Sequence, residues 1–190
     1  MRSSLITAIR YTIITTVLLG IVYPLIVTGI AQVTMRDKAN GQLITRNGVV
    51  IGSAIIGQNF TSANYFHGRP SAAGNGYDAA NSGGSNLAQS NSALVDRINS
   101  AVAAYQKQNP GKPVPIDLVT TSASGVDPDV SPATALYQVS AVAAARHLPE
   151  ETVLKLVRDH IRGRQFGVLG EPRVNVLQLN LDLDALTAAR

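Results

Sequence analysis

The residues best suited to phosphate chemistry in this chain are Ser82, Gly83 and Gly84, in the segment SGGSN. Successive backbone N–H groups in a glycine-rich turn can form a nest that holds a phosphate, so these residues are a candidate nucleotide contact. A plain serine-glycine turn is the alternative interpretation. The Walker motif is missing, because the chain's one Gly-Lys pair continues into proline. We therefore expect no ATP hydrolysis through a Walker loop.

Other catalytic and metal-binding patterns are also missing. The histidines His67, His147 and His160 lack the spacing typical of metal ligands. Ser122 and Ser124 lie before a glycine, but the G-x-S-x-G motif of serine hydrolases is absent. Cysteine is absent, which excludes thiolate chemistry. The sequence predicts no catalytic residue, no metal site and no cofactor bound by this chain alone.

The overall charge gives no indication of a nucleic-acid partner. The formal net charge is +4, and two of these charges come from the N-terminal Arg2 and Arg10. Only 15% of the residues are charged, whereas about 25% is typical of soluble domains. A surface with so few charges suggests that partner proteins cover part of it.

The elements that position these residues begin with a long apolar segment. From Tyr11 to Met35 no side chain is charged at neutral pH, and about 25 residues in a helix exceed the ~30 Å hydrocarbon core of a bilayer. A cleaved signal peptide is the alternative, but its apolar region would be only about 7–15 residues long. Because a short basic N-terminus usually stays inside, we expect residues 1–10 in the cytoplasm, 11–35 across the membrane and 36–190 outside.

The apolar segment also carries a stripe of small and weakly polar residues at every fourth position: Thr12, Thr16, Gly20, Pro24, Thr28 and Gln32. Such residues let membrane helices approach closely and form hydrogen bonds across the contact, so we expect this stripe to contact a partner helix. The alternative is that each threonine bonds its own preceding turn and that Gly and Pro are merely tolerated. Pro24 should kink the helix near Gly20.

The remainder is predicted to be an α+β domain with a small sheet and about three helices. Strands are expected in residues 48–56 and 115–121, and the alternation of leucine with polar residues over 177–184 is typical of a half-buried strand. The Ser-, Gly- and Asn-rich residues 71–91 have the composition of a flexible linker, with an ordered loop over a partner as the alternative.

Three helices are predicted from capping signals and apolar spacing. They are a helix capped by Asn91 or Ser92 and stopped by Pro110-Gly111, a helix opened by Ser131-Pro132, and a helix opened by Pro149 and ended by Gly163. Before them, Tyr65, Phe66 and Arg69 lie in a segment that we expect to be exposed and to contact a partner, since arginine binds carboxylates well. A solvated loop is the alternative for this segment.

Five segments together resemble one known family: GSAIIGQNF from Gly52, YFHGRPSA from Tyr65, SGGSNLA from Ser82, VPIDLVTTSASGVDP from Val114 and LGEPRVNVLQLNL from Leu169. Over nearly its whole length the chain is similar to the C subunit of the bacterial Kdp high-affinity potassium-transporting ATPase. The resemblance implies a single-pass protein of the bacterial inner membrane, with a periplasmic domain and surrounding lipid. It also implies three partners, namely a potassium-pore subunit, a P-type ATPase subunit and a small fourth subunit.

Two functions follow from this resemblance. The first is an accessory, non-catalytic subunit that is needed for assembly and stability, to which the family attributes a chaperone-like rise in the ATP affinity of the ATPase subunit. An external domain could change that affinity only through coupling between distant sites. The second is a regulatory subunit that contacts ATP directly, together with the ATPase subunit. In both cases ATP is expected only with the ATPase subunit present.

Overall fold

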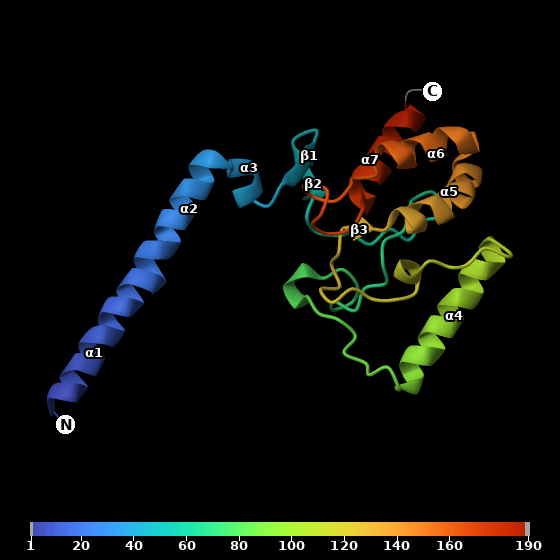
Figure 1. Cartoon of the computed structure of the whole chain (residues 1–190). Helices are drawn as coiled ribbons and strands as arrows, with labels where there is room; N and C mark the ends of the chain where they lie inside the picture. Colours follow the sequence, from blue (N-terminus) through green and yellow to red (C-terminus); the bar gives the residue numbers. More distant parts are fainter. Residues whose placement is uncertain (1, 189–190) are drawn as a thin grey trace. The chain divides into compact units, whose positions relative to one another are not determined.

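The structure is a computed structural model that describes residues 2–188. The chain divides into two compact units, with the division between Ile51 and Gly52. Figure 1 labels most of the elements that start in the first unit, which are α1 (Arg2–Val17), the π-helical turn η1 (Leu18–Val22), α2 (Tyr23–Thr34), α3 (Arg36–Ala39), β1 (Leu43–Arg46) and β2 (Val49–Ser53). Strands β1 and β2 pair with each other. Strand β2 lies within residues 48–56, where the sequence predicts a strand, and β1 precedes this range.

The apolar segment forms a continuous helix from Arg2 to Thr34, which is 33 residues long. Within residues 2–188 it is the one helix that is long and apolar enough to cross a membrane. At 1.5 Å per residue its length is about 50 Å, which exceeds the ~30 Å hydrocarbon core. The helix ends at Thr34, one residue before Met35, and it includes residues 2–10, whose expected position in the cytoplasm stays a prediction.

Pro24 disrupts the regular helix one turn before its own position. Proline lacks an N–H, and its ring would meet the carbonyl of the fourth residue back, which is Gly20. The helix accommodates this with η1, where the Tyr23 N–H donates to the carbonyl of Leu18, five residues back. A π-helical turn, a known cause of helix bending, therefore lies at the position where the sequence predicts a kink.

The second unit holds the remaining elements, which are η2 (Ala79–Asn81), α4 (Ser92–Gln108), η3 (Ile116–Leu118), β3 (Asp129–Val130), α5 (Pro132–Arg146), α6 (Glu150–Asp159), β4 (Val174–Asn175) and α7 (Val176–Ala188). Helix α6 packs against both α5 and α7 around a core that includes Phe66 and Leu179. Figure 1 shows α4 apart from these three helices. Helix α4 instead packs on a smaller core formed by η3 and Tyr137 of α5.

The strand predicted over residues 177–184 is wrong, because this segment is helix α7. Its buried side chains include Val176, Leu179, Asn180 and Leu183, which follow the i, i+3, i+4, i+7 spacing of one helix face. The alternating leucines share only the i, i+4 step with this helix face, through Leu179 and Leu183, and Val176 supplies the i+3 and i+7 spacing. A strand would place the polar Asn180 side chain in solvent, but in the structure this side chain is only 1% exposed.

Other boundaries are partly corrected. The β-prone residues 115–121 contain the 3-10 turn η3 and no strand, and α6 ends at Asp159, before the predicted Gly163. The antiparallel pair β3 and β4 aligns Asp129 with Asn175. The predicted caps are confirmed, since Asn91 accepts from the Ala93 N–H and Ser131 accepts from the Thr134 N–H.

Candidate functional site

The segment from Tyr65 to Ser71 crosses the second unit and is fixed by two side-chain amides. Asn180 of α7 accepts from the Phe66 N–H at 2.9 Å and donates to the Phe66 carbonyl at 2.9 Å. Gln138 of α5 does the same for His67, at 2.8 and 3.1 Å. The two amides thus replace the neighbouring strand that an extended segment would otherwise need for its backbone groups.

The prediction that this segment is exposed is wrong for Phe66, whose side chain is 0% exposed and lies in the main core. Tyr65 is partly buried, with its hydroxyl 3.2 Å from Asp184 and its ring 4.6 Å below the Arg146 guanidinium carbon. Both aromatic residues therefore make contacts inside this chain. The physical reason is that the segment supplies the ring that fills the space between α5, α6 and α7.

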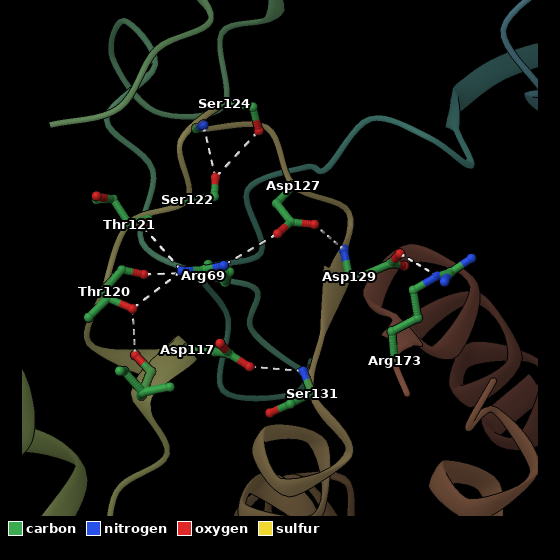
Figure 2. A network of polar contacts seen from close by, with 12 residues as sticks. Arg69, Asp117, Thr120, Thr121, Ser122, Ser124, Asp127, Asp129, Ser131 and Arg173 are labelled. Carbon is green, nitrogen blue, oxygen red and sulfur yellow. Dashed lines mark hydrogen bonds and ion pairs between the residues drawn. The ribbon is translucent and has the colours of Figure 1, made fainter. Parts of the chain in front are cut away.

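Arg69 connects this segment to the loop of residues 120–127. Its side chain donates to the Thr120 carbonyl at 3.4 Å and to the Thr121 carbonyl at 3.2 Å, and one nitrogen lies 3.6 Å from the Asp127 carboxylate. Figure 2 shows the guanidinium at the centre of these contacts. Because one planar cation satisfies several acceptors, Arg69 fixes the loop geometry. Whether Arg69 also contacts a partner, as we expect from the sequence, stays a prediction.

The Ser-, Gly- and Asn-rich residues 71–91 are an ordered loop, and its first part is tied down by Ser71 and Tyr77. Ser71 Oγ donates to the Gly125 carbonyl at 2.5 Å and accepts from the Tyr77 N–H at 2.7 Å. The Tyr77 hydroxyl donates to the Arg69 carbonyl at 2.7 Å. Burial, followed by the nearby Asp127 carboxylate, raises the pKa of Tyr77 to about 12, so this hydroxyl stays a donor.

The candidate phosphate nest, Ser82 to Gly84, contacts the loop of residues 120–127. The Gly83 N–H donates to the Ser124 carbonyl at 2.8 Å, and Ser82 Oγ donates to the same carbonyl at 2.8 Å. A nest needs adjacent N–H groups that point to the anion, and the Gly83 group is occupied inside the chain. The geometry therefore favours the plain structural turn at Ser82, Gly83 and Gly84.

An acidic cleft lies beside Arg69 and is lined by Asp117, Asp127, Asp129, Glu171 and Arg173, among others. Burial alone would raise the pKa of Asp117, but hydrogen bonds from Ser131, with help from Arg69 and Thr134, hold this pKa below its usual value. The pKa of Asp129 is raised, mainly by burial and also by the Asp127 carboxylate, although a hydrogen bond from Asn175 and the Arg173 guanidinium at 3.0 Å both lower it.

The hydroxyl and imidazole groups that could do chemistry are used in local structure. Ser122 Oγ accepts from the Gly125 N–H at 2.9 Å, and Ser124 Oγ accepts from the Val126 N–H at 3.2 Å. His160 contacts Asp182 at 3.0 Å. His67 Nε2 lies 3.1 Å from the Ser62 carbonyl. These contacts hold turns and helix ends together.

Sequence reasoning missed several residues that form this site. Gln138 and Asn180 interrupt apolar helix faces, and a buried amide within such a face is the signal that could have found them. Asp127 and Thr120 gave no signal, because loop residues have no periodicity. The structure does bring Arg69 and Ser82 to the same loop, which their spacing in the sequence did not indicate.

We expect Arg69→Ala to reduce the free energy of unfolding by about 1–2 kcal/mol, because it leaves loop carbonyls and Asp127 without their charged partner. Arg46→Ala, in the exposed strand β1, should change stability by less than about 0.5 kcal/mol. Denaturant unfolding of the purified subunit checks both variants. Equal behaviour of the two would show that Arg69 is only a solvated loop residue.

Comparisons with known proteins agree on one family. The sequence model described as KdpC, K+-transporting ATPase, c chain, matches residues 5–185. A potassium-transporting ATPase KdpC subunit of Koribacter versatilis is 60% identical over 184 residues, which is 97% of this chain and 95% of the relative. The KdpC subunits of Acidobacterium capsulatum and Methylobacterium nodulans are 58% and 48% identical, over 95% and 98% of this chain and 97% and 96% of the relatives.

Proposed function

This chain belongs to the KdpC family, the c chain of the K+-transporting ATPase, and from that premise we propose that it is a non-catalytic accessory subunit of an ATP-driven potassium uptake complex. Its apolar helix anchors it in the bacterial inner membrane beside the pore, ATPase and small fourth subunits. Its second unit lies in the periplasm, over the pore entrance. The observation that carries this proposal is the full-length family match combined with one membrane-capable helix.

The structure of the second unit supports an accessory role. Arg69, Asn180 and Gln138 use their polar atoms to hold a loop in place, which gives a rigid surface for contact with partners. The direct ATP-binding alternative receives less support, because the Gly83 N–H is already bonded to Ser124. Any rise in the ATP affinity of the ATPase subunit would then require two states of the whole complex with different contacts to this chain.

Topology is the decisive test of this function. A reporter enzyme fused after Arg190 should be active only in the periplasm, and the purified subunit should show no saturable ATP binding. Co-purification of the wild-type chain with the pore and ATPase subunits should be stoichiometric. A cytoplasmic reporter, together with ATP binding that is lost in the Ser82→Ala/Gly83→Ala double variant, would contradict the accessory role and support the regulatory one.

The membrane helix offers a prediction with a matched control. On the helix, Thr7, Thr15 and Thr34 lie off the stripe and donate to carbonyls of their own preceding turn. Within the described residues, Thr12, Thr16 and Thr28 of the stripe show no such bond, which leaves their hydroxyls for a partner helix. Gln32 is the exception, because it donates to Asn40 at 3.0 Å.

We therefore expect Gly20→Leu to reduce recovery of the complex in mild detergent at least about threefold, because the new side chain separates the helices. The helix itself should tolerate the change, since a Cβ at Gly20 would lie 3.9 Å from the Thr16 methyl group. Gly29→Leu, one residue off the stripe and in open space, is the control and should leave recovery unchanged. Equal recovery of the complex with the two variants would show that the stripe faces lipid and not a partner helix.

A further inference from the structure

Residues 162–173, between α6 and β4, form a hairpin that is closed by backbone hydrogen bonds. Arg162 and Arg173 exchange two backbone hydrogen bonds of 2.9 Å, and Gln165 and Leu169 exchange two more of 2.9 Å. Between these two pairs, a nitrogen of Arg164 lies 2.8 Å from both carboxylate oxygens of Glu171. The hairpin of residues 162–173 is thus held at its base, middle and tip by its own bonds.

The tip of this hairpin is apolar and exposed. Phe166 is 85% exposed, Val168 is 72% exposed and Leu169 is 56% exposed, and the first two exceed every other described large apolar side chain after Gly52. Phe166 also has a φ of +54°, a left-handed conformation that is unfavourable for a bulky residue. A strained aromatic residue that the second unit leaves 85% exposed suggests a contact outside that unit.

The charges around the hairpin argue against lipid as the occupant. A basic loop that binds lipid phosphates would keep its cations free. Here Arg162 donates to Gln178, Arg164 is paired with Glu171, and Arg173 lies 3.0 Å from Asp129. Two of the three arginines are thus paired with carboxylates, which leaves little free positive charge for lipid phosphates, whereas an uncharged apolar pocket on a protein needs none.

The area of the tip limits the kind of protein that can bind it. A phenylalanine side chain buries about 150–250 Å², so three apolar side chains offer on the order of 400 Å². A stable complex of free proteins buries about 800 Å² on each side. The tip is too small to hold a freely diffusing partner. It can strengthen a contact with a protein that the membrane helix already keeps close, because tethering raises the effective concentration.

We propose that the hairpin tip of Phe166, Val168 and Leu169 inserts into an apolar pocket on another subunit of the same membrane complex. This inference rests on the proposed function as an accessory subunit, and it names the surface that this function uses outside the membrane. The partner surface is a shallow pocket without unpaired charge, on the side of the membrane where the second unit lies.

The chain has no natural cysteine, so one cysteine can report on the tip. Val168→Cys carries a polarity-sensitive fluorophore, and Ser100→Cys on the exposed side of α4 is the matched control. In vesicles of phosphatidylethanolamine and phosphatidylglycerol that hold the whole complex, we expect a blue shift at position 168 and at least about threefold protection from iodide quenching. The subunit alone in the same vesicles should show neither effect. A blue shift in vesicles without the complex would identify lipid, and no shift in the complex would equally overturn the proposal.

A second variant separates this inference from the proposed function. Phe166→Asn removes the ring and suits the left-handed backbone, so the isolated subunit should unfold at the same or a higher temperature. Dissociation of the complex should become at least about fivefold faster. Ile116→Asn, at another exposed site, should leave this rate unchanged. If complexes with the two variants dissociate at the same rate while the wild-type chain assembles with the pump, only the hairpin inference fails. If the wild-type chain does not assemble with the pump, the proposed function fails too.

Discussion

Asn180→Leu should lower the free energy of unfolding of the second unit by about 2–5 kcal/mol, because it leaves the buried N–H and carbonyl of Phe66 without partners. Leucine has a similar size, so the loss would come from the unpaired backbone groups and not from a cavity. Many domains are stable by only 5–15 kcal/mol in total. We therefore expect a loss of about 10 °C or more in the thermal midpoint.

Circular dichroism of the full-length subunit in detergent measures this change. Asn99→Leu, on the exposed side of α4, is the control and should shift stability by less than about 0.5 kcal/mol. Gln138→Leu should resemble Asn180→Leu, and the double variant should cost less than the sum, since loss of either amide already loosens the same segment. Stability of Asn180→Leu equal to that of the control would refute the role of the two amides.

Gly125→Ala is expected to be comparably severe, with a loss of about 2–5 kcal/mol from backbone strain and crowding combined. Gly125 has a φ of +68°, and an added Cβ would lie 2.6 Å from the Gly83 carbonyl oxygen and 2.7 Å from the Ala73 Cβ. Two parts of the loop of residues 71–91, around Ala73 and Gly83, meet the loop of residues 120–127 at this point. The variant should therefore release the Ser82 and Gly83 contacts with Ser124, which hydrogen exchange of the loop amides would detect.

Two other glycines separate the two causes. Gly111 has a φ of +79° in open space, so Gly111→Ala measures backbone strain alone and should cost about 1 kcal/mol. Gly83 has no atom within 4 Å of its added Cβ and no positive φ, so Gly83→Ala should be nearly neutral. Equal losses of stability at Gly125 and Gly111 would mean that close packing of the two loops around Gly125 contributes nothing.

Much of the fold could be predicted from local signals. The apolar segment from Tyr11 to Met35, the caps at Asn91 and Ser131, and the irregularity near Gly20 depend on neighbouring residues in the chain. Short-range sterics and hydrogen bonding determine such features, so a single sequence contains them. The family could be recognised for a related reason, since its motifs are contiguous segments.

The candidate site was less predictable because its contacts join distant segments. Phe66 and Asn180 are separated by 114 positions, and Arg69 and Thr121 by 52. A side chain that looks exposed in its own segment can be buried by another segment, which is why the sequence predicts Phe66 on the surface and Asn180 on the solvent-facing side of a half-buried strand.

The sequence by itself determined a membrane-capable helix, the capped helices that follow it and the family, because each depends on residues close together in the chain. Only the tertiary structure decided that residues 177–184 form a helix, that Arg69 links loops, and that Gly83 uses its N–H within the chain. These outcomes depend on which surface packs against which. Burial of a polar group is favourable only when its hydrogen-bond partner arrives from elsewhere in the fold.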